Sequence, residues 1–307
     1  MNAIYIDAPV TDAQRREHLY RGQLLVYSPT PSSLALVDFA RKLAEDAFHP
    51  LDPETAQFHV PVERYAAILS ELKPKFIHAP ESKQCIQGML RELGCDPEKT
   101  YFDVPRMRSS TSDDFLTVGI AYAFHPHRDT WYSAPMCQIN WWMPIYPIVP
   151  ENAMAFHPRY WSHGVKNGSA EYNYQEWNRT SRQNAAQFIK QDTRVQPKPE
   201  EPMELDPQIR VIAPPGGVLL FSAAQMHSSV PNTSGHTRFS IDFRTVNVDD
   251  VAARRGAPNV DSRCTGTCMG DYLRGTDLTR VPEEYFSLYE TQPEIVKTEA
   301  VEAAASA

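Results

Sequence analysis

Two side chains that could hold a metal ion stand close together in the chain. His127 and Asp129 are two residues apart in the stretch Phe-His-Pro-His-Arg-Asp. On an extended strand, residues i and i+2 point to the same face. We therefore expect the imidazole and the carboxylate to reach one ion. His227, about a hundred residues later, offers a third ligand. His127 is preferred to His125 as a ligand, because it lies two residues before the aspartate.

This ligand set points to a specific chemistry. Two histidines and one carboxylate form the facial triad of non-haem Fe(II) oxygenases, which leaves coordination positions open for a cosubstrate and O₂. The His-x-Asp pair alone is weak evidence, since such residues near a strand end are more often simply solvated or hydrogen-bonded. Arg238 follows His227 by eleven residues. Its planar guanidinium could bind the distal carboxylate of 2-oxoglutarate. Ser229 and Ser240 could add hydroxyl donors.

The elements that must position these residues follow from the hydrophobic pattern. Apolar residues at helical spacing predict helices, and stretches of β-branched and aromatic residues predict strands. The expected helices cover 33–48, 61–73 and 81–93, with a short helix within 181–190 and a last one over 281–289. The expected strands cover 23–27, 101–108, 114–123, 136–145, 153–157, 210–213, 217–222 and 239–248. Helices followed by many strands predict a β-sandwich or jelly roll with helices packed on one face.

The same pattern sets the expected domain organisation. We expect a single catalytic domain over 1–290, with a helical part over 1–100 and a jelly-roll core over about 101–250. The segment 162–210 is polar and poor in aliphatic residues, which indicates a long insertion or lid. The Ala/Glu-rich end, 291–307, is expected to be a disordered tail.

Composition limits the classes of function. The chain has 307 residues, of which 42% are hydrophobic, enough for one large domain or two small ones. A net charge of -8 argues against general nucleic-acid binding. The chain has no apolar run of about 18 residues, so no membrane span is predicted. No secretory signal is visible, so a cytoplasmic location is expected. The five cysteines are expected to be reduced, with Cys264 and Cys268 as incidental loop thiols.

Several segments around the ligands resemble one known family. The likeness is carried by His127-Arg-Asp129, Gln138–Ile145, Glu151–Pro158, Gly216–Phe221, His227-Ser-Ser229, Asn232 and Arg238. Over about 101–248 the chain resembles the phytanoyl-CoA dioxygenase-like branch of the Fe(II)/2-oxoglutarate-dependent oxygenases. It departs from that family at Ala153 and at Arg159-Tyr160-Trp161, where the family usually has glycine and Gly-Ser-His. The resemblance implies a mostly β fold with flanking helices, built on a double-stranded β-helix (jelly roll, cupin-like).

The resemblance also implies roles for single residues. The Fe(II) ligands would be His127, Asp129 and His227. Arg238 would bind the C5 carboxylate of 2-oxoglutarate, with Ser229 as a helper. Gln138 and Asn140 could reach 2-oxoglutarate or substrate, or could equally be buried amides bonded to the backbone. Further pocket residues are expected at Arg106, Arg108, Trp131, Tyr132, Trp142 and His157. For the two arginines, a surface or structural ion pair is an equal alternative.

The expected activity is O₂-dependent hydroxylation of a small molecule, with release of succinate and CO₂ from 2-oxoglutarate. Desaturation or another oxidation would use the same residues and stays open. Arg128, Arg159 and Lys166 place positive charge in an acidic chain, which favours an anionic substrate. A cupin-type metal enzyme without 2-oxoglutarate would not need Arg238, and a catalytically silent jelly-roll binding protein would not need the full triad. No nucleic-acid partner is expected, and a homo-oligomer is not indicated.

Overall fold

The strands form two sheets. The computed structural model describes residues 3–122, 125–180, 187–189, 191–194 and 196–301. The strands are β1 (Ile4–Ile6), β2 (Leu24–Tyr27), β3 (Thr100–Phe102), β4 (Arg106–Ser110), β5 (Ile139–Pro144), β6 (Met154–Phe156), β7 (Ile209–Arg210), β8 (Val218–Ser222), β9 (His227–Ser229), β10 (Arg238–Asn247) and β11 (Leu273–Arg274). The larger sheet has eight strands in the order β1-β2-β8-β5-β10-β3-β11, with β4 also paired to β10, and the smaller sheet has the order β7-β6-β9.

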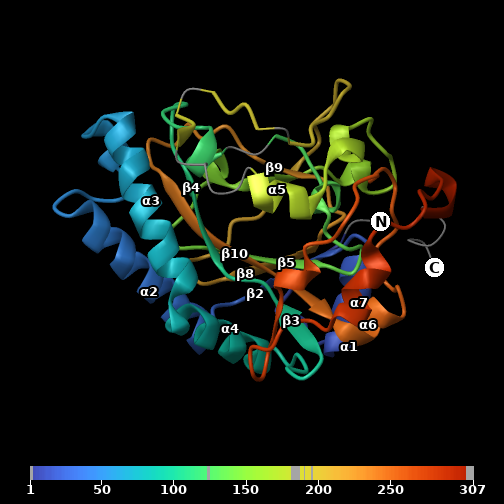
Figure 1. Cartoon of the computed structure of the whole chain (residues 1–307). Helices are drawn as coiled ribbons and strands as arrows, with labels where there is room; N and C mark the ends of the chain where they lie inside the picture. The colour runs from blue at the N-terminus through green and yellow to red at the C-terminus, as the bar shows by residue number, and fades with distance from the viewer. Residues whose placement is uncertain (1–2, 123–124, 181–186, 190, 195, 302–307) are drawn as a thin grey trace.

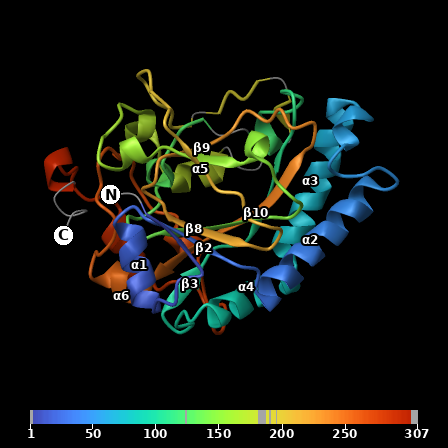
Figure 2. The ribbon, with the colours of Figure 1, turned by 180° about the vertical axis from the view of Figure 1, so that it is seen from behind.

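Seven α-helices are described, and three of them cover one side of the larger sheet. The seven helices are α1 (Asp12–Tyr20), α2 (Pro31–Phe48), α3 (Val62–His78), α4 (Pro80–Glu92), α5 (Tyr174–Thr180), α6 (Val248–Ala252) and α7 (Glu283–Phe286). In Figures 1 and 2, α2, α3 and α4 flank and underlie the sheet, whereas β9 and α5 lie on its other side. Helix α2 begins where Thr30 and Ser33 form a capping box around Pro31. No helix among the described residues is long and apolar enough to cross a membrane.

Strand β10 separates the core from the cavity by simple alternation. Phe239, Ile241 and Phe243 have no exposed surface and belong to the main hydrophobic cluster shared with α2 and α3. The residues between and beside them line a cavity on the opposite face: Arg238, Ser240, Asp242 and Arg244. Because successive side chains of a strand point to opposite faces, one strand contributes to both the core and the cavity.

Most expected elements are present, and the sheet with flanking helices is confirmed. The helices expected over 33–48 and 81–93 are α2 and α4, while the one expected over 61–73 is α3, which continues through Pro74 to His78. The strand expected over 101–108 is divided into β3 and β4. Strands β1, β2 and β11 lie outside the expected core of about 101–250 but belong to the larger sheet. The helix expected within 181–190 falls largely outside the described residues.

The prediction of a strand over 114–123 was wrong. Asp113 and Asp114 both have left-handed backbone angles, with φ of 54° and 55°, and Gly119 has φ of 62°. Such residues turn the chain, because an extended strand needs strongly negative φ. Over 114–122, the described part of that range, the chain instead forms turns and one 3₁₀ turn, η2 (Gly119–Ala121).

The last described residues are in contact with the body of the protein. The Val296 backbone amide donates a 2.8 Å hydrogen bond to the Asn259 carbonyl. Val301 is 3% exposed and packs in a cluster with Trp161 and Val260. Residues within 291–301 therefore contact the rest of the chain, and the disordered tail expected over 291–307 stays a prediction.

Candidate active site

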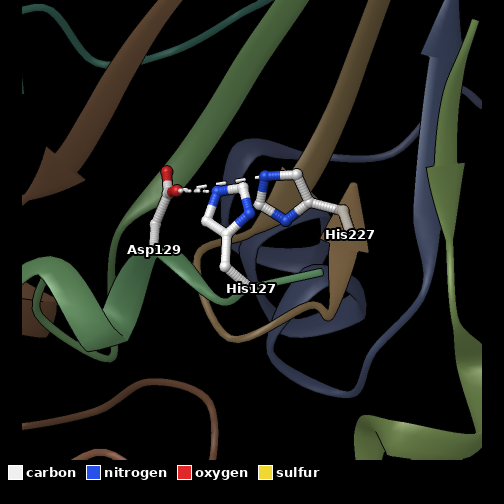
Figure 3. Close-up of side chains that lie close together, drawn as sticks. All are labelled: His127, Asp129 and His227. Atoms are coloured by element: carbon white, nitrogen blue, oxygen red, sulfur yellow. Dashed lines mark ion pairs between the residues drawn. The ribbon is translucent and has the colours of Figure 1, made fainter. Parts of the chain in front are cut away.

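The three expected metal ligands meet at one place, on segments far apart in the chain (Figure 3). The backbones of His127 and His227 pair through reciprocal hydrogen bonds of 2.9 and 3.0 Å. Their Nε2 atoms lie 3.5 and 3.9 Å from Oδ1 of Asp129. One ligand atom from each residue can be chosen so that all lie within 4.8 Å of one another, so a single ion could contact all three.

The local structure that brings them together differs from the one expected. Asp129 does not continue an extended strand. It begins a 3₁₀ turn, η3 (Asp129–Tyr132). The expected i, i+2 relationship on a strand was therefore the wrong reason for the meeting of the two side chains. Pairing with His227 fixes His127, and the turn carries the carboxylate to the same point.

Each imidazole is oriented by a backbone carbonyl. Nδ1 of His127 is 2.8 Å from the carbonyl oxygen of His125, and Nδ1 of His227 is 3.0 Å from that of Gln225. Since a carbonyl only accepts, each Nδ1 donates to it, and this orientation turns Nε2 of each ring towards the site. Burial and the neighbouring His127 lower the pKa of His227 to about 3, so that ring is neutral at physiological pH.

The second oxygen of Asp129 faces a different set of groups. Arg244 Nε lies 3.8 Å and Gln138 Nε2 lies 3.5 Å from Oδ2. Burial alone would raise the pKa of Asp129, but hydrogen bonding to His127 and the charge of Arg244 hold it well below its usual range. The carboxylate is therefore ionised, and Oδ1 is the oxygen turned towards the histidines.

A hydrogen-bond chain fixes the orientation of the Gln138 amide. Tyr272 donates from its hydroxyl to Gln138 Oε1 over 2.6 Å, so the Gln138 NH₂ group faces the site. That NH₂ group donates over 2.9 Å to Asn140 Oδ1. Gln138 and Asn140 therefore bond to side chains here, rather than to the backbone.

A cavity of about 410 Å³ opens beside the triad. Arg238 lines it and is 7% exposed. Its Nη1 donates over 2.8 Å to the Asn152 carbonyl, but its Nε has no hydrogen-bond partner. Two further buried polar atoms of the cavity wall also lack a partner, Ser240 Oγ and Asn140 Nδ2. Burial lowers the pKa of Arg238 to about 10, which leaves it charged. Unpaired buried donors of this kind are costly unless a ligand satisfies them.

Most of the other expected site residues also line this cavity: Arg106, Arg108, Tyr132, Gln138, Trp142 and Ser229. The two arginines are held by carboxylates there. Arg106 forms an ion pair with Asp103, and Arg108 contacts Asp242 at 2.6 and 3.2 Å. They thus combine the two alternatives considered for them, structural ion pairs and pocket wall.

Two expected pocket residues lie elsewhere. Trp131 is fully buried beside Val165, and its indole N–H donates over 2.7 Å to Asp261. Its side chain supports the fold and does not line the cavity. His157 is held between the Leu205 carbonyl and the Ser228 hydroxyl, at 3.1 and 2.9 Å, and faces a separate hollow.

The three cations taken as a sign of an anionic substrate are also outside the cavity. Arg128 is 1% exposed, pairs with Asp261 at 3.0 Å and donates to backbone carbonyls. Arg159 and Lys166 form exposed ion pairs with glutamates. Their positions give no support to that expectation.

Sequence reasoning missed several residues of the cavity wall: Lys73, Tyr122, Tyr172, Tyr174, Trp177, Arg194, Asp242 and Arg244. Asp242 and Arg244 could have been found, because they share the period-2 face of Arg238. Lys73 falls four residues after Leu69 in the apolar stripe of α3, which is an unusual place for a charge. Residues of 162–210, the segment expected to be a long insertion or lid, line part of the cavity, although no single residue of it had been named for the site.

Comparisons with known proteins add the following. No known protein family matches the sequence, and no curated protein does. Among solved structures, the chain is similar to the non-heme monooxygenase ThoJ, with 11% identity over 95% of this chain and 94% of that one and a TM-score of 0.43. It is also similar to EvdO2 from Micromonospora carbonacea var. aurantiaca complexed with 2-oxoglutarate, with 11% identity, 78% and 91% coverage and a TM-score of 0.42.

A third similar structure is the epimerase SnoN in complex with Fe³⁺, alpha ketoglutarate and nogalamycin RO. It has 14% identity, covers 77% of this chain and 85% of that one, and has a TM-score of 0.37. TM-scores and identities this low do not establish a common activity. The interpretation of the site therefore rests on its own geometry.

Proposed function

We propose that the protein is a non-haem Fe(II)/2-oxoglutarate-dependent oxygenase that hydroxylates a small molecule. One observation carries the proposal. The triad of His127, Asp129 and His227 and the partly unpaired guanidinium of Arg238 line the same cavity. A divalent metal explains the first group, and a carboxylate explains the second.

The residues present fit this cofactor set. Two imidazoles and one carboxylate suit Fe(II) and leave positions open around it. The unpaired Arg238 Nε, Ser240 Oγ and Asn140 Nδ2 supply donors for a carboxylate-bearing cosubstrate. When bound, Fe(II) with 2-oxoglutarate and O₂ supplies the oxidising chemistry, and succinate and CO₂ are released.

The protein's own residues would bind the cosubstrate, orient the metal ligands and shield the reacting centre from water. The backbone carbonyls of His125 and Gln225 keep each ligand imidazole in the orientation that presents Nε2. Arg238 would anchor 2-oxoglutarate by its C5 carboxylate, assisted by Ser229 as the resemblance implies. Aromatic side chains of the wall, such as Tyr132 and Trp142, would limit access of water to the reacting centre.

Several finer predictions belong to the same proposal. They are membership of the phytanoyl-CoA dioxygenase-like branch, a double-stranded β-helix as the core, the domain limits and a cytoplasmic location. Desaturation or another oxidation by the same site stays open, because the residues named above serve those reactions equally well.

The test combines binding with turnover. In anaerobic calorimetry of protein loaded with Fe(II), we expect Arg238→Met to weaken 2-oxoglutarate binding at least about 30-fold, since a desolvated charge pair is lost. Asp129→Ala should abolish succinate formation from 2-oxoglutarate with Fe(II) and ascorbate. The exposed residue Arg64 offers a matched control, Arg64→Met, which should change neither. Unchanged succinate formation in Asp129→Ala would refute the assignment of the triad as the metal ligands. A protein that binds 2-oxoglutarate without ever forming succinate would instead be a binding protein.

A further inference from the structure

The cations of the cavity wall differ in whether they have a counter-ion. Arg106 and Arg244 both contact Asp103, Arg108 contacts Asp242, and Arg194 contacts Asp192 at 2.8 Å. Among the described residues, two cations that line the cavity form no ion pair with a carboxylate: Arg238 and Lys73. The proposed function assigns Arg238 to 2-oxoglutarate, which leaves Lys73 without an explanation.

The groups to which Lys73 donates hydrogen bonds are polar but uncharged. Its side chain leaves α3 and donates to Ser109 Oγ over 3.2 Å and to the Ile120 carbonyl. An ammonium has three donors, so a third remains for the cavity. The residue is 9% exposed, and burying an unpaired charge to this extent is costly. Arg108 adds further positive charge nearby, and Asp242, already paired with Arg108, offsets part of it.

We propose that Lys73 binds an anionic group of the substrate, a carboxylate or a phosphate ester, at the end of the cavity formed by α3, η2 and β4. The inference rests on the proposed function in taking this cavity as the substrate site. An anion there would supply the missing counter-ion and would use the third donor of the ammonium. It would also keep the remainder of the substrate within the cavity that contains the triad.

Burial and the charge of Arg108 lower the pKa of Lys73 to about 7. An ammonium without a counter-ion should have a lowered pKa, and a bound anion should raise that pKa again. The Ile120 carbonyl alone does not require a lysine, because a neutral donor would satisfy it at lower desolvation cost.

The test uses three aromatic probes that differ in charge: phenylacetate, phenyl phosphate and neutral phenylacetamide. Each is titrated calorimetrically into protein saturated with Fe(II) and 2-oxoglutarate in the absence of O₂. We expect at least one anionic probe to bind at least about tenfold more tightly than the amide, and Lys73→Met to remove that difference. Lys75→Met is the matched control, since Lys75 is exposed on the same helix, and it should bind like wild type. Dependence on Lys73 for only one anion would identify the class of anion.

Equal binding of the anions by wild type and Lys73→Met would overturn the proposal, as would equal binding of amide and anions by wild type. A readout without substitution guards against a local rearrangement. In protein with ¹³C-labelled lysines, NMR should show the pKa of Lys73 rising when the preferred anion saturates the protein, and a constant value would also overturn the proposal.

The probe titrations are repeated in Arg238→Met protein without 2-oxoglutarate. The Lys73 comparison then no longer depends on the cosubstrate, which separates this inference from the proposed function. If wild type binds no 2-oxoglutarate, the proposed function fails, while the Lys73 comparison still gives its own result. If 2-oxoglutarate binds and is converted to succinate but the probes do not depend on Lys73, only the present inference fails.

Discussion

Nε of Arg244 lies 3.8 Å from Oδ2 of Asp129, the carboxylate oxygen that does not face the two imidazoles. Arg244 is itself held by Asp103 at 3.0 Å and lies 3.7 Å from Asp242. A guanidinium fixed on one side of a carboxylate limits its rotation. We infer that Arg244 positions Asp129 so that Oδ1 is the oxygen offered to a metal.

Arg244→Met should therefore weaken metal binding without removing a ligand. We expect the affinity for Co(II), measured by its visible absorption or by calorimetry, to fall about 10- to 100-fold. Arg244→Lys should restore part of the Co(II) affinity, because it returns the positive charge without the planar guanidinium. Arg64→Met is the exposed control. Unchanged Co(II) affinity in Arg244→Met would show that Asp129 does not need this support.

Tyr272→Phe tests the chain from Tyr272 through Gln138 to Asp129. The change leaves the buried Gln138 Oε1 without its 2.6 Å donor, so we expect a loss of about 1–3 kcal/mol in the free energy of unfolding. Metal affinity should also fall several-fold, because the amide is freer to turn. Tyr289→Phe is matched, since its hydroxyl donates to the buried Val251 carbonyl away from the triad. If both variants bind metal equally well, the chain does not act on Asp129.

Arg128→Met should destabilise the fold. The guanidinium is buried, pairs with Asp261 and bonds to the carbonyls of Ala224 and His163. Removing one partner of a buried ion pair costs about 3–5 kcal/mol, which urea unfolding would measure. Arg159→Met, which breaks only an exposed pair with Glu204, should cost less than about 1 kcal/mol. A small effect in Arg128→Met would show that this buried ion pair contributes little to stability.

The pKa of Lys73 predicts a pH dependence of stability. Below pH about 7 the group is protonated in both the folded and unfolded states, and the folded state bears the full cost of the buried charge. Between about 7 and the usual value of 10.5, only the unfolded state holds the proton, so stability rises with pH. Relative to Lys73→Met, wild type should gain about 2 kcal/mol between pH about 7 and about 9.

Unfolding curves in urea at several pH values would measure this gain, with Lys75→Met as a variant that keeps the wild-type trend. A difference between wild type and Lys73→Met that stays constant with pH would contradict the shifted pKa.

The sequence predicted which residues of the candidate site lie together better than it predicted the local structure that brings them together. His127, Asp129, His227 and Arg238 could be named from residue type and spacing, and they do gather at one cavity. The strand expected around the first two is absent, because Asp129 starts a turn. Local patterns describe regular elements well, whereas consecutive left-handed residues such as Asp113 and Asp114 leave no periodic signal.

Tertiary placement explains the other misses. Trp131 follows a ligand in sequence, yet its indole N–H finds Asp261, which is 130 residues away. Lys73 belongs to a helix whose remaining buried face is mostly apolar, and only the packing of α3 beside β4 and η2 shows that its amine reaches the cavity. Both outcomes depend on contacts between distant segments, which no local pattern encodes.

Strand β10 also constrains how this protein could be altered. Its odd-numbered positions Phe239, Ile241 and Phe243 build the core, and its even-numbered neighbours face the cavity. A single inserted or deleted residue would exchange the two sets and place guanidinium groups among the helices. New ligand specificity can therefore arise here by substitution at alternate positions, but not by a change in the length of the strand. A library that varies only Ser240 and Asp242 would explore ligand preference while leaving the hydrophobic half of the strand untouched.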